Sequence, residues 1–293
     1  MRVPHVQPAE PLTEVDPSRF LASWSVEDPR GCQIGVIGLA DDTGVAMNHG
    51  RPGAAGGPWA LRQALRGYGV ANPSTWKWPR VFDAGDVLAG DSLEETHDRV
   101  TEATAALIDA GLTPVAIGGG HDLTFPFVRA VAQSRPDPLV GVYFDAHLDV
   151  RDAEGSGMPF RRLVDRCGVT ELHVHGLDPN ANTAEHTNWF AAHGGRVDPF
   201  EPEDKWPEGD LFVSFDLDVI DAAYAPGVSA MNPAGWAPRT AARWVYAAGQ
   251  CERVRCFDIM ELAPTLDPSG RSSRLAARLL LEFMRGFAER NPS

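Results

Sequence analysis

Residues 143–150, YFDAHLDV, end an apolar segment with three polar side chains in alternating positions. Asp145, His147 and Asp149 are each two residues apart, and side chains with this spacing point to the same face of a strand. Burying two carboxylates and an imidazole together is unfavourable unless a positive charge holds them. The stretch therefore predicts that a cation binds where a buried strand ends.

Apolar and amphipathic segments alternate along the chain on both sides of this stretch. The expected strands are residues 33–39, 80–87, 113–119, 138–145, 171–177, 210–216 and 254–262. The expected helices are residues 57–69, 93–110, 124–134, 184–194, 237–250 and 270–289. This order predicts a parallel sheet with right-handed crossovers and helices on both faces. We interpret residues 1–293 as one domain, in which residues 1–32 form a polar N-terminal extension.

The composition argues against several classes of protein. Hydrophobic residues make up 43% of the 293 residues, enough for a sizeable core. The net charge of −14 argues against nucleic acid and anionic membranes as partners. The sequence contains no apolar run of about 18 residues and no signal peptide, so we expect a cytoplasmic protein without a membrane span. Four scattered cysteines without a CxxC pair indicate neither a zinc site nor a disulfide framework.

Three of the expected strands end in residues that can bind metal. These residues are His121 after a triple glycine, the group Asp145, His147 and Asp149, and the pair Asp216 and Asp218. The carboxyl ends of parallel strands form the usual ligand site of such sheets. Four carboxylates in one crevice would repel each other, and two divalent cations would balance their charge. Oxygen-rich ligands without thiolates suit Mn²⁺ better than zinc. Such a pair of ions can convert a shared water into hydroxide at neutral pH.

These motifs resemble the ureohydrolase family, which includes arginases, agmatinases and formimidoylglutamases. The family patterns GG-x-H, D-A-H-x-D and S-F-D-x-D end here at His121, Asp149 and Asp218. The resemblance implies a three-layer α/β/α fold with a mainly parallel eight-stranded sheet and two Mn²⁺ ions per chain. It also implies that His121, Asp149 and Asp218 lie near one ion and His147 near the other. Asp145 and Asp216 would serve both ions.

The resemblance also implies the catalytic roles. The family holds the amidine or guanidine of its substrate with a glutamate that corresponds to Glu261 in DIMEL, residues 258–262. A carboxylate opposite a planar cation makes paired, charge-assisted hydrogen bonds. We expect Asp149 to hold the nucleophile and then to protonate the leaving nitrogen.

Several stretches are similar to formimidoylglutamases in particular, namely residues 44–65, 156–163 and 214–230, together with Arg151. The expected reaction converts N-formimidoyl-L-glutamate and water into L-glutamate and formamide, in histidine degradation. Met158 departs from the threonine of the formimidoylglutamase pattern S-G-T-P-F. The loop after Asp149 also lacks the histidine that arginases and agmatinases carry there. The alternatives are a guanidine hydrolase that acts on arginine, agmatine or a guanidino acid, and a catalytically silent metal-binding protein.

The acidic tail of this substrate requires positively charged partners. Arg51, Arg151, Arg161 and Arg162 lie close to the metal motifs in sequence, and an arginine fork suits a carboxylate. Asn180 and Asn182, after another expected strand, are further candidates for substrate binding. His173 and His175 share one strand face, and we interpret them as a packed or surface pair rather than a second metal site. The expected partner is a small amidine or guanidine, and the sequence is compatible with a homo-oligomer.

Overall fold

One nine-stranded sheet forms the centre of the computed structural model, which describes residues 1–9, 15–16, 18–69 and 78–290. The strands are β1 (Val6–Gln7), β2 (Ile34–Leu39), β3 (Val81–Val87), β4 (Thr113–Ile117), β5 (Val140–Phe144), β6 (Leu172–His175), β7 (Gly195–Val197), β8 (Leu211–Asp216) and β9 (Val254–Met260). Their order across the sheet is β1-β3-β2-β4-β9-β8-β5-β6-β7. All neighbouring strands are parallel except β1, which pairs antiparallel with β3.

The sheet therefore has one strand more than the expected eight. β1 and β7 were not among the segments predicted from the sequence, because two- and three-residue strands are too short for an apolar run. The other seven strands all coincide with predicted segments.

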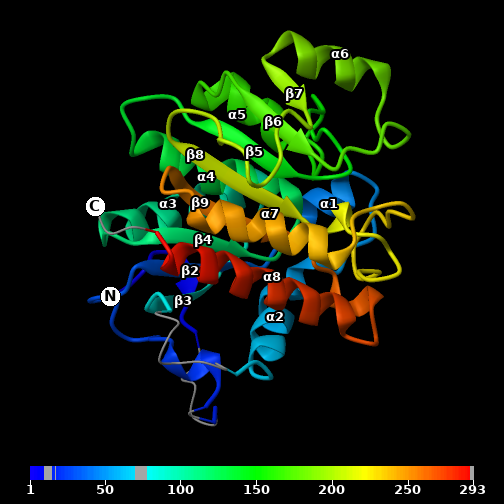
Figure 1. Cartoon of the computed structure of the whole chain (residues 1–293). Coiled ribbons are helices and arrows are strands. Elements are labelled where there is room, and N and C mark those ends of the chain that lie inside the picture. Colours follow the sequence, from blue (N-terminus) through cyan, green and yellow to red (C-terminus); the bar gives the residue numbers. More distant parts are fainter. Residues whose placement is uncertain (10–14, 17, 70–77, 291–293) are drawn as a thin grey trace.

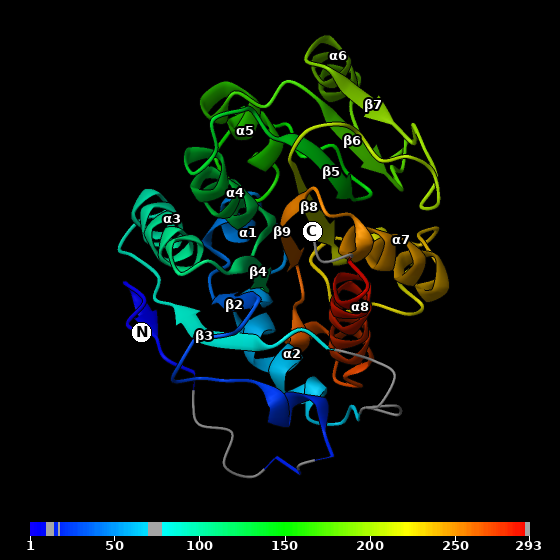
Figure 2. The same ribbon diagram turned by 60° about the vertical axis from the view of Figure 1, so that its left-hand side comes forward.

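Helices cover both faces of the sheet (Figures 1 and 2). They are α1 (Thr43–Met47), α2 (Gly57–Leu65), α3 (Leu93–Asp109), α4 (Thr124–Gln133), α5 (Pro159–Cys167), α6 (Ala184–Ala192), α7 (Pro238–Gln250) and α8 (Arg271–Ala288). Short 3₁₀ helices are η1 (Phe20–Ser23), η2 (Ala54–Gly56), η3 (His121–Leu123), η4 (Leu217–Val219) and η5 (Pro264–Leu266). One buried core packs α2, α7 and α8 on the sheet, and a second packs α3, α4 and α5 on the opposite face. Successive side chains of a strand point to opposite faces of the sheet, as β5 shows. Val142 and Phe144 belong to the first core, and Tyr143 belongs to the second.

Two helices, α1 and α5, were not predicted. The sequence of α5 is rich in arginine, but Pro159 occupies its first turn and Gly168 ends it with a φ of 72°. Proline at a helix start and a left-handed glycine after its end are recognised helix signals. Capping of α3 agrees with the sequence, because the Ser92 side chain accepts a hydrogen bond from the Glu95 N–H. No helix within the described ranges is long and apolar enough to cross a membrane.

Candidate metal centre

Four neighbouring strands bring the predicted ligands to one edge of the sheet. His121 follows β4 after a glycine turn, Asp145 follows β5, Asp216 ends β8 and Glu261 follows β9. Because β4, β9, β8 and β5 are adjacent in this order, the four strand ends meet near the middle of the sheet. Residues that are far apart in sequence thus share one crevice at the carboxyl ends of parallel strands.

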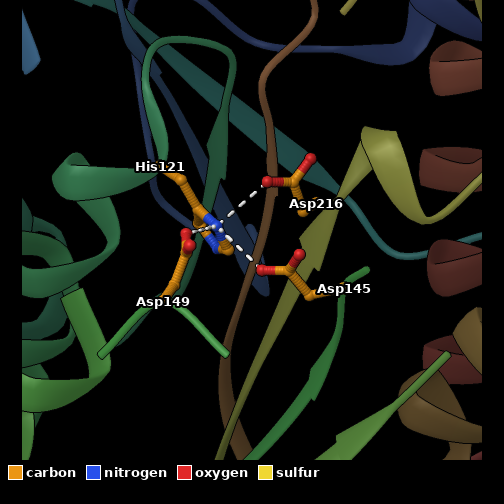
Figure 3. A group of neighbouring side chains, drawn as sticks. All are labelled: His121, Asp145, Asp149 and Asp216. Atoms are coloured by element: carbon orange, nitrogen blue, oxygen red, sulfur yellow. Dashed lines mark ion pairs between the residues drawn. The ribbon is translucent and has the colours of Figure 1, made fainter. Parts of the chain in front are cut away.

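The first cluster is centred on the imidazole of His121 (Figure 3). Its Nδ1 atom lies 3.2 Å from Asp145 Oδ2, 2.9 Å from Asp149 Oδ2 and 3.0 Å from Asp216 Oδ2. Each of these four residues offers one ligand atom, and the four atoms lie within 4.8 Å of one another. This is the arrangement expected around a cation.

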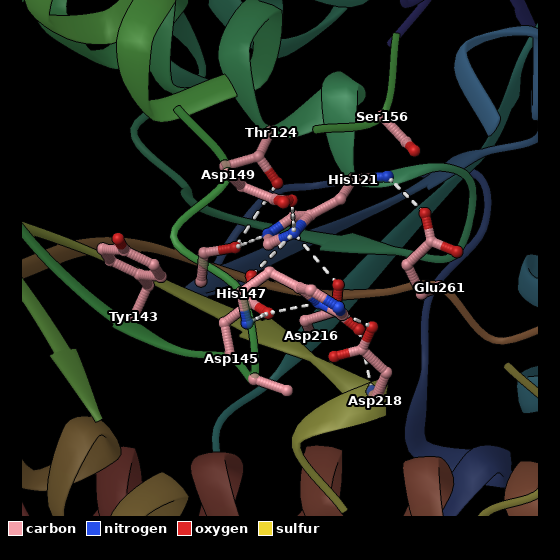
Figure 4. Close-up of polar contacts among 12 residues, drawn as sticks. His121, Thr124, Tyr143, Asp145, His147, Asp149, Ser156, Asp216, Asp218 and Glu261 are labelled. Atoms are coloured by element: carbon pink, nitrogen blue, oxygen red, sulfur yellow. Dashed lines mark hydrogen bonds and ion pairs between the residues drawn. The ribbon is translucent and has the colours of Figure 1, made fainter. Parts of the chain in front are cut away.

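The second cluster is centred on His147 (Figure 4). Its Nδ1 atom lies 3.3 Å from Asp145 Oδ1 and 3.2 Å from Asp218 Oδ2. Asp145 therefore presents one carboxylate oxygen to each cluster, as expected for a residue that serves both ions. Asp218 lies beside His147 and not beside His121, which differs from the predicted grouping. The reason is local: the chain turns into η4 after Asp216, so Asp218 does not continue the alternation of β8.

The tautomer of His121 fits a metal ligand. Ser214 Oγ donates a 2.6 Å hydrogen bond to Asp258 Oδ1, so the Ser214 oxygen is free to accept from His121 Nε2–H at 3.0 Å. This assignment leaves a lone pair on His121 Nδ1, which faces three carboxylate oxygens. An acceptor nitrogen among acceptor oxygens is repulsive unless a cation lies between them. Asp258 was missed in the sequence, although a carboxylate inside an apolar strand was a usable signal.

Several buried polar atoms of the site lack a hydrogen-bond partner among the described residues. They are His121 Nδ1, Asp145 Oδ2, Asp218 Oδ1 and Glu261 Oε2. An unpaired buried polar atom is costly, and natural proteins rarely keep several together without a bound group. The donor set of imidazole nitrogen and carboxylate oxygen, without thiolate, suits Mn²⁺. The residues present therefore fit two divalent ions.

Crowded charges shift the pKa values of the site when no cation is bound. Burial, together with the charges of Asp218 and Asp145, raises the pKa of Asp216 well above its usual range. Burial opposes protonation of His121, but the Asp216, Asp145 and Asp149 carboxylates outweigh it and raise the His121 pKa. Asp145 behaves differently: burial raises its pKa, but the neighbouring His121 and His147 side chains outweigh burial and lower it. Without metal the site therefore retains protons in place of cations.

Glu261 lies beside His121 at the cavity and has a strained backbone conformation. Its φ is 65°, and Asp149 is likewise left-handed at 47°, a region that non-glycine residues rarely adopt. Glu261 accepts a 2.9 Å hydrogen bond from the His121 N–H and donates its own N–H to the Gly119 carbonyl at 2.9 Å. Burial raises the pKa of Glu261 to about 8.

A cavity of about 320 Å³ opens over these residues. Its lining comprises Asn48, His49, Gly50, Arg51, His147, Asp149, Arg151, Ser156, Ala181, Asn182, His186, Asp216, Asp218, Ser229, Ala230 and Glu261. Three residues that the sequence predicts for substrate binding line this cavity, namely Arg51, Arg151 and Asn182. His186, on α6, also lines the cavity but was not predicted. Its position four residues after Asn182 was the available signal.

Other predicted residues lie elsewhere. The exposed Asn180 does not line the cavity, and neither do Arg161 and Arg162. Arg161 pairs with Asp152 at 3.3 Å. Arg162 donates to the Asp152 carbonyl at 2.9 Å, and its Nε donates to the buried Met158 sulfur at 3.3 Å.

Asn182 shapes the site through the backbone. Its Oδ1 accepts from the Leu148 N–H at 2.9 Å, and its Nδ2 donates to the Ala146 carbonyl at 2.9 Å and the Asp178 carbonyl at 2.8 Å. Both ends of the amide are thus used to hold the segment that carries His147. This favours a positioning function for Asn182 over direct binding of substrate.

His173 and His175 are packed residues, as the sequence suggested. The His175 ring centroid lies 4.2 Å from that of Trp244 and 4.6 Å from that of Phe200. His173 Nε2 lies 2.9 Å from Glu171. The pair joins neither of the metal-type clusters found among the described residues.

Comparison with known proteins agrees with this site. The model of the arginase family matches residues 32–286. The formimidoylglutamase of Aromatoleum aromaticum is 35% identical, with 90% of this chain and 85% of that protein covered. The mitochondrial guanidino acid hydrolase of Homo sapiens is 32% identical, with 87% and 78% covered. The crystal structure of Trypanosoma cruzi formiminoglutamase with Mn²⁺ superposes with a TM-score of 0.85 at 28% identity, and the match covers 94% of this chain and all of the other. With its fold, strand-end clusters and sequence similarity considered together, this chain belongs to the arginase family.

Proposed function

We propose that this chain is a manganese-dependent hydrolase that converts N-formimidoyl-L-glutamate and water into L-glutamate and formamide. The observation that carries the proposal is the pair of clusters joined by Asp145, with the free oxygen of buried Glu261 beside them. The names of several similar proteins support the choice of substrate. The enzyme class is that of the arginase family, a hydrolase family.

The proposed ligands form two overlapping sets. His121, Asp145, Asp149 and Asp216 would hold one Mn²⁺, and Asp145, His147 and Asp218 the other. The chemistry that such a pair supplies when bound is a water of lowered pKa, and hence hydroxide near neutral pH.

Glu261 orients the amidine in this proposal. One of its oxygens is occupied by the His121 N–H, and the other has no partner among the described residues. The substrate amidinium is a planar cation that presents N–H donors toward this oxygen. A buried carboxylate gives a charge-assisted hydrogen bond there, which fixes the amidine carbon relative to the metal crevice.

Asp149 is the proposed proton carrier. Its side chain is 13% exposed, whereas those of Asp145, Asp216 and Asp218 are 0%, 3% and 5% exposed. It also lines the cavity, so among the four it has the best access to a substrate nitrogen. A proton held on Asp149 can pass to the leaving nitrogen as the C–N bond breaks.

Arg51 and Arg151 line the same cavity as the acidic residues Asp149, Asp216, Asp218 and Glu261. Formimidoylglutamate carries two carboxylates, and an arginine side chain can bind a carboxylate through two parallel hydrogen bonds. Agmatine has no carboxylate and would gain nothing from these residues.

A substrate panel tests the proposal. The Mn²⁺-loaded protein is incubated with formimidoylglutamate, arginine, agmatine and guanidino acids, and formamide, urea and ammonia are quantified. Formamide from formimidoylglutamate supports the proposal. Urea would identify a guanidine hydrolase, which the similarity to the human guanidino acid hydrolase keeps as the second candidate. Lack of turnover on every compound would indicate a metal-binding protein without activity.

A further inference from the structure

The two cavity arginines are held by neutral groups. Arg51 Nε donates to the Ser229 carbonyl at 2.9 Å, and its Nη2 donates to the Val228 carbonyl at 2.7 Å. Arg151 Nη1 donates to the side-chain oxygen of Asn48 at 2.7 Å. Neither arginine forms an ion pair with any carboxylate in the described part of the chain. Both guanidinium groups are therefore held in place, but no carboxylate of the described residues is paired with their positive charges.

Several arginines elsewhere are paired with acids. Arg62 contacts Asp83 and Asp86, Arg161 contacts Asp152, and Arg243 contacts Glu203. Other arginines, such as Arg19 and Arg253, are held by backbone carbonyls as Arg51 is. What distinguishes Arg51 and Arg151 is their place, because both line the cavity above the metal clusters and both keep an unpaired positive charge there.

Asn48 is the residue that holds the guanidinium group of Arg151. It ends α1, and its amide nitrogen donates to Ser156 Oγ at 3.2 Å while its amide oxygen accepts from Arg151. The orientation of the amide follows from chemistry, because a guanidinium group can only donate. The Ser156 N–H in turn donates to the Gly44 carbonyl at 2.9 Å. Asn48 thus connects the end of α1 to the loop that carries Arg151.

We infer that Asn48 is a positioning residue that determines specificity: it fixes the Arg151 guanidinium for a substrate carboxylate while leaving its charge available. This inference rests on the proposed function. An aspartate at position 48 would hold Arg151 at least as firmly, because a charge-assisted hydrogen bond is stronger than a neutral one. It would also neutralise the charge that attracts an acidic substrate. An uncharged side chain at position 48 is therefore required for binding an acidic substrate, and a side chain of the same shape with a negative charge would not serve.

The test compares Asn48→Asp with Asn48→Ala. Each variant is assayed on formimidoylglutamate and on N-propylformamidine, which has no carboxylate. For Asn48→Asp we expect KM for formimidoylglutamate to rise about tenfold or more, with kcat nearly unchanged, because one charge-assisted hydrogen bond is lost. Kinetics on N-propylformamidine should not change. Asn48→Ala should raise KM less, since it frees Arg151 without neutralising it.

A purely structural Asn48 predicts the opposite order. Aspartate nearly matches asparagine in shape and keeps the contact with Arg151, so it would be the milder substitution. If Asn48→Ala is the more damaging variant, or if both substrates lose equally, the inference is wrong. The ratio of kcat/KM for the two substrates does not depend on the fraction of folded enzyme, so partial unfolding of a variant cannot imitate the expected result.

Two further measurements complete the design. Ala46→Asp adds the same charge on the exposed surface of α1 outside the cavity, and it should leave both kinetic constants unchanged. Calorimetric binding of L-glutamate requires no turnover, and Asn48→Asp should weaken it about tenfold. Glutamate affinity that is equal in wild type and Asn48→Asp would overturn the inference even if wild type releases formamide. Absence of formamide from wild type would instead refute the proposed function.

Discussion

The carboxylate of Glu261 accepts a 2.9 Å hydrogen bond from the backbone N–H of His121, a residue 140 positions earlier in the chain. The reciprocal bond from the Glu261 N–H to Gly119 ties the end of β9 to the turn after β4. One oxygen of Glu261 therefore maintains the architecture, and the other remains available to a ligand. The structural function and the ligand-binding function of Glu261 can therefore be separated by mutation.

Replacing Glu261 by Gln should reduce activity without unfolding the protein. Glutamine keeps an oxygen that can accept from the His121 N–H, but it removes the negative charge opposite the amidinium. We expect kcat/KM to fall about 10- to 100-fold, the value of a charge-assisted hydrogen bond. The melting temperature should change little. Activity equal to wild type would exclude Glu261 from substrate binding.

Asp149→Asn should lower turnover far more than it weakens substrate binding. The change removes a proposed metal ligand and the proposed proton carrier, and general acid–base catalysis contributes about 10²- to 10⁴-fold. Steady-state kinetics at saturating Mn²⁺, together with metal analysis of the variant, separate the two effects. A loss confined to KM would argue against proton transfer by Asp149.

Removal of metal should abolish activity and lower stability. We expect Mn²⁺ to restore activity best and to bind at two ions per chain. A ligand of the folded state stabilises it by about 2.7 kcal/mol at a hundredfold excess over Kd. In a domain of this size, each kcal/mol shifts the melting temperature by about 2–4 °C, so a rise of several degrees is expected from a scan with and without chelator. Full activity with Zn²⁺ alone, at one ion per chain, would contradict the two-ion centre.

The metal-free protein should become more stable on mild acidification. Burial raises the pKa of Glu261 to about 8 and that of Asp216 above its usual range. Such carboxyls bind protons in the folded chain at pH values where the unfolded chain has released them, so folding gains stability as pH falls from 8 toward 5. The raised pKa of His121 acts with the same sign. The lowered pKa of Asp145 acts with the opposite sign, but only near and below its ordinary value of 3.8.

Thermal scans of chelated protein at pH 8 and pH 6 measure this effect. The melting temperature should be higher at pH 6, whereas the Mn²⁺-loaded protein should show no such gain. Asp216→Asn combined with Asp218→Asn is the control, because it removes two of the crowded charges. The double variant should show a smaller pH response and a smaller response to metal. A chelated wild type that melts at a lower temperature at pH 6 would refute the crowding argument.

Lysine at position 151 should reduce the preference for acidic substrates. The change keeps the charge but loses the planar fork that binds a carboxylate through two bonds. Kinetics should show less turnover of formimidoylglutamate and little change on N-propylformamidine. Arg51→Lys should in addition lower the melting temperature, because Arg51 also donates to the carbonyls of Val228 and Ser229. Equal losses of Arg151→Lys on both compounds would assign Arg151 to the fold.

The sequence was sufficient to predict the parallel sheet and the convergence of the metal-type residues. The reason is that apolar strands followed by regularly spaced polar residues leave a local pattern, and a parallel sheet brings strand ends together. It did not predict the place of Asp218, because a 3₁₀ turn after Asp216 breaks the alternation of an extended strand. Nor could it reveal β7, which is three residues long and mostly exposed.

Contacts between distant segments were also beyond the sequence. The bond from Arg151 to Asn48 spans 103 positions, and that from Ser214 to Asp258 spans 44. Neither follows from a local spacing, because each depends on how loops and neighbouring strands pack in three dimensions. The packed state of His173 and His175 was anticipated, but their aromatic neighbours Trp244 and Phe200 were not.

The order of the strands has a consequence for biosynthesis. The clusters draw on β4, β5 and β8, but β9 lies between β4 and β8 in the sheet and is synthesised last of the four. A ribosome-bound chain that has not yet emerged beyond Met260 therefore lacks the strand that joins the two halves of the site. Bringing β9 next to β4 closes a loop of more than a hundred residues. Closing so long a loop is entropically costly and slow compared with local helix formation. Tight metal capture should therefore mark the completion of the sheet, and Mn²⁺ added to shorter nascent chains should find no preformed centre.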